Sequence, residues 1–143
     1  MTAVATIQAL LGGESVTGPL RTEFDVVRLV RRGVPTAAID HFLAASHLTF
    51  NAIEGHVLAR RTFKRRQDAA QPLDPVESDR LLRLVRLVAA ACETFGDSHK
   101  ALTWLSRANR TLDGQTPLSL ADTDQGARSV DTLLGRIGHG LAA

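Results

Sequence analysis

The chain has 143 residues, of which 44% are hydrophobic and 22% charged, and its formal net charge is +2 at pH 7. That length suits one domain, or a small domain with appendages, and the composition excludes an intrinsically disordered chain. A charge of +2 does not by itself indicate a polyanionic partner, so the distribution of charge along the chain matters more than the total.

Residue usage favours helices. Tyrosine is absent, and Leu, Ala and Arg are abundant, which predicts an all-α fold. The single cysteine, Cys92, excludes a disulfide framework and fits a reducing compartment. The sequence has neither a signal-peptide pattern at its start nor an apolar stretch long enough to cross a bilayer. We therefore expect a cytoplasmic protein that does not contact the membrane.

The front part of the chain predicts a short lead-in followed by small helices. Residues 1–20 are rich in Gly, Thr and Ser, which indicates a flexible lead-in with one helical turn. A helix capped by Thr22 and ending at Gly33 follows, and further helices are predicted at about 36–45, from 48 onward and at 61–68. The last two have the spacing of a helix-turn-helix unit, so residues 21–71 are predicted to resemble a DNA-binding domain.

A basic run coincides with the second helix of this unit. Residues 60–66 hold five positive charges in seven positions. Such side chains neutralise DNA phosphates, and an arginine in the major groove can pair with guanine. The alternative is a solvated helix face, and the turn lacks the glycine common in such motifs. The candidate DNA-binding residues are Arg60, Arg61, Thr62, Lys64, Arg65 and Arg66.

One long helix is predicted at the centre of the fold. Asp74 is a good helix cap, Pro75 suits the first helical position, and Glu77 completes a capping box. Gly96 is the expected C-terminal stop. The apolar positions between these ends form a stripe so wide that the helix must be largely buried. Three arginines on the remaining face are expected to pair with nearby carboxylates rather than form a catalytic site: Arg80, Arg83 and Arg86.

Shorter helices are predicted behind the long one. Asp97 or Ser98 begins a helix that carries Trp104 in the core, a turn follows at 109–114, and a short helix follows at 116–122. Asp124 is the expected cap of the last helix. Three glycines fall in the last nine residues, which predicts a tail that is flexible until something holds it.

Catalytic and metal-binding motifs are missing from the sequence. The five histidines fit no ligand spacing, and no phosphate-binding loop, nucleophile elbow or dinucleotide fingerprint occurs. We expect no enzyme activity, no metal and no cofactor.

The back half carries an ordered series of short motifs: Leu73-Asp-Pro-Val-Glu-Ser-Asp-Arg-Leu-Leu-Arg-Leu84, Phe95-Gly-Asp97, Ala101, Trp104-Leu105, Asn109, Gly114-Gln-Thr-Pro-Leu118, Asp122-Thr-Asp124, Gly126-Ala127, Val130, Leu134-Gly-Arg-Ile137 and His139-Gly140. This series, over residues 72–143, resembles the toxin-binding domain of the Xre/MbcA/ParS antitoxins of RES–Xre type II toxin–antitoxin systems. Arg61-Thr-Phe63 followed by Arg65-Arg66 also resembles the recognition helix of that family, with Phe63 in place of the usual Leu.

The resemblance implies a bifunctional antitoxin. Its Cro-like or Xre-like front domain would bind operator DNA and repress its own operon, and its back domain would neutralise a RES-domain toxin that degrades NAD. The family implies a homodimer that forms a higher hetero-oligomer with the toxin, whose NAD pocket the C-terminal segment covers. The chain ends on Leu-Ala-Ala where the family usually has an aromatic residue. The implied toxin-binding residues are Gly135, Arg136, Ile137, His139, Gly140, Leu141, Ala142 and Ala143.

Two other functions remain open from the sequence. One is a free-standing transcription regulator in which the back half serves only as a dimerisation module. The other is a toxin-binding protein whose helix-turn-helix unit no longer contacts DNA.

Overall fold

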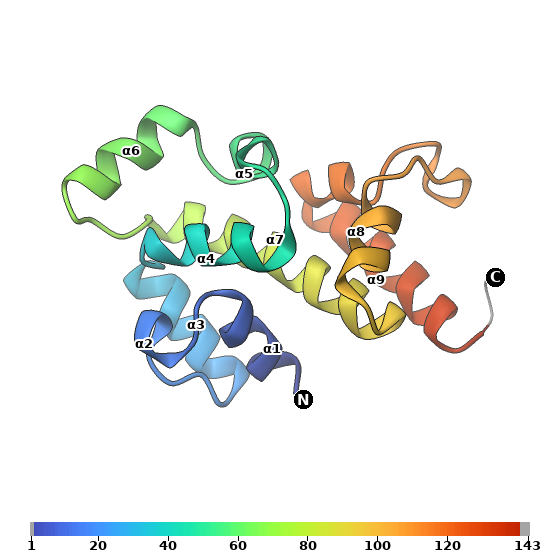
Figure 1. Ribbon diagram of the computed structural model, residues 1–143, viewed down its shortest axis with the longest axis horizontal. Helices are drawn as coiled ribbons and strands as arrows, with labels where there is room; N and C mark the ends of the chain where they lie inside the picture. Colours follow the sequence, from blue (N-terminus) through green and yellow to red (C-terminus); the bar gives the residue numbers. More distant parts are fainter. Residues whose placement is uncertain (1, 141–143) are drawn as a thin grey trace.

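A computed structural model describes residues 2–140, and within that range the chain is helical with no strand. The prediction of an all-α fold is therefore confirmed. The described residues form nine α-helices, labelled in Figure 1, and two 3₁₀ helices: α1 Ala3–Leu10, α2 Glu14–Thr17, α3 Glu23–Arg32, α4 Ala37–Ser46, α5 Phe50–His56, α6 Arg60–Asp68, α7 Pro75–Phe95, α8 Ser98–Leu105, η1 Arg110–Leu112, η2 Leu118–Asp122 and α9 Asp124–Gly138.

The long helix α7 begins and ends where the sequence predicts. The Asp74 carboxylate accepts a hydrogen bond from the Glu77 N–H at 2.7 Å, and the Glu77 carboxylate accepts one from the Asp74 N–H at 2.9 Å. Pro75 occupies the first helical position, and Gly96 closes the helix in the left-handed conformation at φ 67°. These contacts satisfy backbone groups that a helix end leaves unpaired, so local chemistry fixes both ends of α7.

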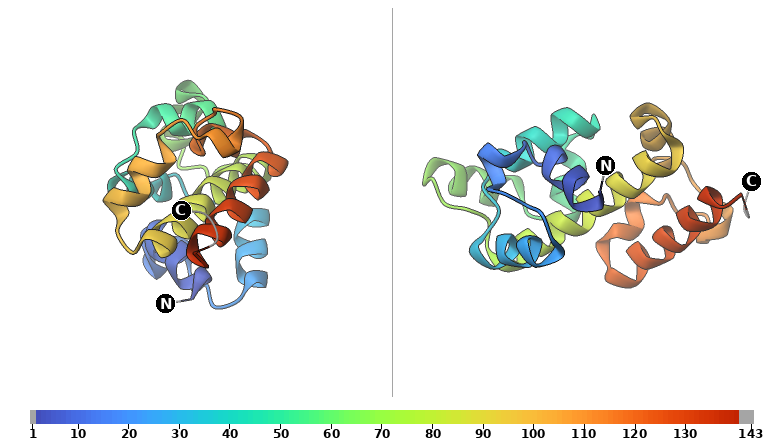
Figure 2. Two further views of the ribbon diagram at one scale, coloured as in Figure 1. Left: turned by 90° about the vertical axis from the view of Figure 1, so that its right-hand side faces the viewer. Right: turned by 90° about the horizontal axis from the view of Figure 1, so that it is seen from below.

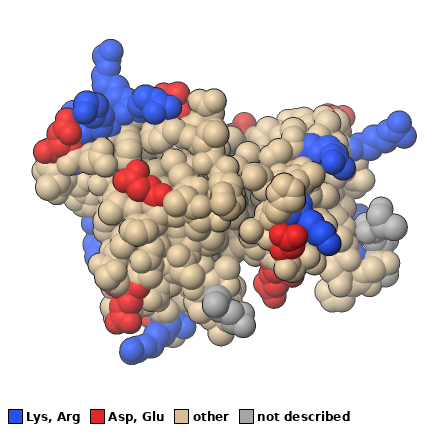
Figure 3. Space-filling model, viewed as in Figure 1, with Lys and Arg blue, Asp and Glu red and all other residues tan. Residues whose placement is uncertain are grey.

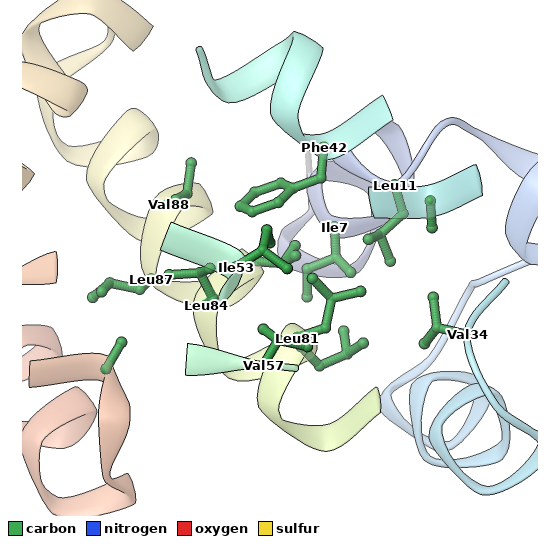
Figure 4. Packing of buried hydrophobic residues seen from close by; sticks show 14 of the residues in the cluster. Ile7, Leu11, Val34, Phe42, Ile53, Val57, Leu81, Leu84, Leu87 and Val88 are labelled. Carbon is green, nitrogen blue, oxygen red and sulfur yellow. The ribbon is translucent and has the colours of Figure 1, made fainter. Parts of the chain in front are cut away.

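Helix α7 joins two groups of helices. Figure 1 shows it running diagonally from the group formed by α1–α6 to the group formed by α8, η1, η2 and α9. It contacts α1, α3 and α5 in the first group and α8, η2 and α9 in the second. The buried side chains of both groups form one hydrophobic cluster, in which Leu81 and Leu84 of α7 lie near Ile7, Ile53 and Val57 (Figure 4). The core is therefore continuous across the molecule.

Residues 2–20 are not the lead-in that the sequence predicts. They form α1 and α2, and four of their apolar side chains belong to the core: Val4, Ile7, Leu11 and Leu20. The Thr2 hydroxyl caps α1 by accepting the Ala5 N–H at 3.0 Å. The prediction gave too much weight to Gly, Thr and Ser, although the apolar positions 4, 7 and 11 already follow a helical period.

The arginines of α7 pair partly as expected. Arg83 lies 3.8 Å from Asp79 one turn before it, and Arg86 forms an ion pair with Glu23 at the start of α3. The hydrogen bond from Arg86, together with its positive charge, lowers the pKa of the Glu23 carboxyl. The pair links α7 to α3 through two residues that are 63 positions apart in the chain.

Two details of the back group differ from the prediction. Thr123, not Asp124, caps α9, because its hydroxyl accepts the Gly126 N–H at 2.9 Å. Trp104, predicted to lie in the core, is at its edge and only half-buried, as is Cys92 near the end of α7. Burial, assisted by the negative charge of Asp97, raises the pKa of the Cys92 thiol. The amphipathic pattern predicts which face turns inward but not how deeply each side chain lies.

The turn after α3 packs directly against the segment before α7. Val34 donates its N–H to the buried Ser78 hydroxyl at 2.9 Å, and its carbonyl accepts the Leu73 N–H at 2.9 Å. Gly33 has a φ of +97°, and a Cβ at this position would overlap the Leu73 carbonyl oxygen. Glycine is required here both for the backbone conformation and for the close approach of the two segments.

Substitution of Gly33 tests this close approach. Gly13 is the matched control, because its φ is +87° but no atom lies near the position of an added Cβ. We expect Gly13→Ala to lower the free energy of unfolding by about 1–2 kcal/mol through backbone strain alone. Gly33→Ala should cost about 1–3 kcal/mol more, because the methyl group overlaps backbone. Urea unfolding followed by circular dichroism measures both, and equal losses would contradict the packing argument.

Candidate nucleic-acid and partner-binding surfaces

Helices α5 and α6 form the helix-turn-helix unit. The residues between them, 57–59, include Val57 and Leu58, which are both buried and hold the turn against the core. Phe63 is the buried residue of α6, and its ring packs on that of Phe50 with 5.2 Å between the centroids. Because the side of α6 that carries Phe63 turns inward, the opposite side is free for solvent or a ligand.

Two contacts fix the start of α6. The Glu54 carboxylate accepts the Arg60 N–H at 3.1 Å, which satisfies a backbone donor at the helix N-terminus. The Arg60 guanidinium carbon lies 4.3 Å from the centroid of the Phe50 ring, a cation–π geometry. Both contacts join α6 to α5 and therefore stiffen the unit. The role of Glu54 cannot be read from the sequence, because a cap from six residues upstream depends on how the turn folds.

Four predicted DNA-binding residues of α6 lie on the surface. Arg60, Arg61, Lys64 and Arg65 are exposed, and Thr62 is half-buried. Figure 3 shows lysine and arginine side chains gathered over α6 at the upper left of the molecule. Lys64 makes a 3.8 Å ion pair with Asp68, and both side chains are more than 60% exposed, so the pair is weak and easily exchanged for a phosphate. These side chains form a positively charged surface on α6.

Arg66 is engaged differently from the other basic residues. Its Nε donates to the Glu77 carboxylate at 2.8 Å, and its Nη2 lies 3.4 Å from the Asp74 carboxylate. Only 18% of the Arg66 side chain and 11% of the Glu77 side chain are exposed. The same Glu77 oxygen accepts the Asp74 N–H in the capping box of α7. Arg66 therefore ties the end of α6 to the start of α7.

The predicted toxin-binding residues lie at the end of α9 and beyond it. Gly135, Arg136, His139 and Gly140 are exposed, whereas Ile137 is half-buried against the core. The start of α9 packs closely against η2, because a Cβ on Gly126 would overlap the Leu120 carbonyl oxygen. The remaining predicted toxin-binding residues lie outside the described chain: Leu141, Ala142 and Ala143.

A groove of about 790 Å³ lies between α1, α7 and α9. Alanines and leucines form much of its lining, and charged residues of α7 and α9 also line it. Several of these charges are already paired, including Arg128 with Asp124 at 2.7 Å. No sequence motif indicates this groove, because it depends on how the first and last helices pack on α7.

The described residues offer neither a metal-binding cluster nor a membrane-crossing helix. No group of three or more His, Cys, Asp or Glu side chains in residues 2–140 is arranged to hold a metal ion. In the same range, no helix combines the length and apolar character that a membrane crossing requires.

Two family models match the chain in succession. The antitoxin Xre-like helix-turn-helix domain matches residues 25–86, which contain α5 and α6 and extend into α7. The antitoxin Xre/MbcA/ParS C-terminal toxin-binding domain matches residues 90–140, which contain α8 and α9. Neither domain is enzymatic, in agreement with the expectation of a regulatory protein.

Curated relatives carry antitoxin names. Antitoxin Xre of Pseudomonas putida (strain KT2440) is 38% identical over 84 residues, which cover 59% of this chain and 53% of the relative. Antitoxin Xre of Yersinia enterocolitica is 40% identical over 82 residues, which cover 57% of this chain and 55% of the relative. These matches thus span about half of each relative. The Prs ADP-ribosylating antitoxin of Sphingobium sp. (strain YBL2) is 30% identical over 132 residues, which cover 83% of this chain and 81% of the relative.

The different positions of Arg65 and Arg66 predict different effects on stability. Arg66→Ala should lower the free energy of unfolding by about 1–3 kcal/mol, because it leaves the Glu77 carboxylate without its cationic partner. Arg65→Ala, on the exposed face of the same helix, should change it by less than about 0.5 kcal/mol. Thermal unfolding of both variants measures this difference. A similar melting temperature for the two variants would show that the ion pair contributes nothing to stability.

Proposed function

The chain belongs to the Xre/MbcA/ParS antitoxin family, and on that premise we propose that it is a type II antitoxin that neutralises a RES-domain, NAD-degrading toxin and represses its own operon. The observation that supports this proposal most is the order of the two domain matches, a helix-turn-helix domain followed by a toxin-binding domain. The match to a toxin-binding domain favours this function over a free-standing regulator.

The toxin-binding part of the proposal rests on the end of α9. Arg136 and His139 are exposed there, beyond the segment that Gly126 anchors on η2. A guanidinium donates charge-assisted hydrogen bonds to carboxylates, so Arg136 would suit acidic groups at the mouth of the toxin's pocket. We propose that this end enters the toxin's NAD pocket and blocks it. The toxin-contacting residues would include Gly135, Arg136, Ile137, His139, Gly140 and the terminal 141–143.

The DNA-binding part of the proposal rests on the exposed cations of α6. Arg60, Arg61, Lys64 and Arg65 would contact operator phosphates or bases, and Thr62 would contact the backbone from the same helix. Arg66 would act indirectly, by holding α6 against α7 through Glu77. Operators of such proteins are commonly two-fold symmetric, so we also propose a homodimer that forms a higher hetero-oligomer with the toxin. The reducing environment that a single cysteine suits makes the cytoplasm the proposed location.

Removal of two exposed cations tests the DNA-binding surface. Arg61→Ala combined with Arg65→Ala should weaken binding to the promoter of its own gene about 10-fold or more, and should reduce the slope of log affinity against log salt by roughly two. Arg107→Ala combined with Arg110→Ala is the matched control, because it removes the same charge from exposed positions of the back group. Fluorescence anisotropy over a range of salt measures both. Equal losses of DNA affinity in the two double variants would show that only the net charge of the protein matters. That result would refute the assignment of DNA binding to α6.

Shortening the tail tests the toxin-binding surface. Deletion of residues from Gly138 onward should abolish neutralisation and leave the melting temperature nearly unchanged, because Gly138, His139 and Gly140 are exposed. Growth of cells that express the neighbouring toxin reports neutralisation. Within the helix, Arg136→Ala should weaken protection, whereas Arg128→Ala at the other end of α9 should not. Full protection by the truncated protein would exclude a role for the tail.

A further inference from the structure

The groove beside α7 is large enough for a short helix of another protein. Seen from below in Figure 2, α1 and α9 lie on opposite sides of α7, and all three helices line the groove. A helix about 10 Å across occupies roughly 400 Å³ per turn, so a groove of about 790 Å³ holds about two turns. We call it the α7 groove, and its lining includes Ala3, Leu82, Ala90, Glu93, Ala127 and Asp131.

Small side chains from each of the three helices line the α7 groove. They are Ala3 of α1, Ala90 of α7 and Ala127 of α9. Ala3 is exposed and the other two are half-buried, so solvent reaches their methyl groups. Because the distance between packed helix axes depends on the side chains at the contact, these alanines let the backbone of a partner helix come close.

Two carboxylates in the α7 groove have no partner in the described chain. Glu93 of α7 and Asp131 of α9 are exposed, and neither forms an ion pair within residues 2–140. The arginines that line the groove already have carboxylate partners: Arg83 with Asp79, Arg86 with Glu23 and Arg128 with Asp124. The charge left over is negative, which favours a basic partner and disfavours nucleic acid.

The side of α9 that lines the groove continues into the end of that helix. Asp131, Gly135 and His139 follow one another at steps of four, which keeps them on one side of the helix, and all three are exposed. Gly135 and His139 belong to the proposed toxin-binding residues. A protein that binds the end of α9 can therefore extend into the α7 groove.

Helix α1 lies outside both segments that the family models match. Those segments are residues 25–86 and 90–140, whereas α1 spans Ala3–Leu10. Glu93, Ala127 and Asp131 fall within the toxin-binding match. The α7 groove thus joins the toxin-binding domain to a helix that neither match includes, and neither match implies it.

We propose that the α7 groove binds a helix of the toxin, whose lysine or arginine side chains pair with Glu93 and Asp131. The inference rests on the proposed function, because its occupant is the toxin, but it adds a contact outside the NAD pocket. The tail of this chain blocks that pocket, and the groove sets the affinity and the choice of partner. An acidic helix would be repelled by the two carboxylates, so the groove also discriminates against wrong partners.

Removal of the two free carboxylates is the first test. Glu93→Gln combined with Asp131→Asn should weaken binding of the purified toxin to the full chain about 10-fold and reduce its salt dependence, since each lost pair contributes about 3-fold. Glu14→Gln combined with Asp40→Asn is the matched control, because both residues are exposed and in no ion pair of the described chain. Isothermal titration calorimetry measures both, and equal losses of affinity would overturn the proposal.

Filling the groove tests its shape. Thr132, an exposed residue of the lining, becomes bulky in Thr132→Trp, which should weaken toxin binding about 10-fold or more by excluding the partner helix. Ser129→Trp adds the same ring at an exposed position of α9 that is not in the lining, and should leave the affinity unchanged. Equal affinities in the two variants would show that nothing enters the groove.

Photo-crosslinking identifies the occupant. In a Cys92→Ala background, Thr132→Cys labelled with benzophenone maleimide should crosslink to a toxin segment with a helical apolar period and a lysine or arginine, as read by mass spectrometry. Labelled Ser129→Cys, the control, should not crosslink to that segment. A crosslink from Thr132→Cys to a second copy of this chain, or to an acidic toxin segment, would overturn the proposal.

Failure of the inference differs from failure of the proposed function. If the wild-type chain does not bind the toxin, the proposed function fails and the inference fails with it. If the wild-type chain and the groove variants bind equally tightly, only the inference fails. The chain shortened at Gly138, which should no longer neutralise, should still bind the toxin measurably through the groove, and loss of all binding would count against the groove.

Discussion

Burial of α7 is the constraint on which the rest of the structure depends. The helix contributes ten buried residues, Glu77 and Ser78 at its start and eight apolar positions after them, and elements from both ends of the chain pack on it. A buried leucine contributes about 2 kcal/mol relative to an exposed one, so α7 supplies a large part of the free energy of folding. Neither group of helices encloses a separate core, because the same hydrophobic cluster serves both.

The capping box of α7 extends this constraint to the basic helix. Glu77 satisfies the backbone at the start of α7 and at the same time accepts the guanidinium of Arg66. The two basic residues at positions 65 and 66 are adjacent in sequence, yet one faces solvent and the other is held in a half-buried ion pair. Helical geometry separates them by about 100°, and only the exposed one is placed to meet phosphate. Position on the helix, more than residue type, decides which arginine is held in an ion pair and which is exposed to solvent.

Local signals allowed much of the fold to be predicted, and tertiary packing explains the remainder. Asp74, Pro75, Glu77 and Gly96 mark the ends of α7 through contacts within a few residues, which a sequence displays directly. The pairing of Arg66 with Glu77 spans 11 residues, and the groove beside α1 depends on three helices far apart in the chain. The glycines and the serine that follow α1 led to the prediction of a flexible segment there. The stability of α1 comes instead from burial against α7. The basic face of α6 could be located from the sequence, but which of its arginines reach solvent could not.

The unbroken course of α7 also limits how such a chain can change in length. No glycine or proline interrupts the helix between Val76 and Phe95, so no hinge lies between the two groups of helices. One residue inserted near its middle would rotate everything downstream by about 100° and shift it by about 1.5 Å. An insertion in α7 would therefore change how the α6 surface and the end of α9 face each other, whereas an insertion in a surface loop would leave that orientation intact.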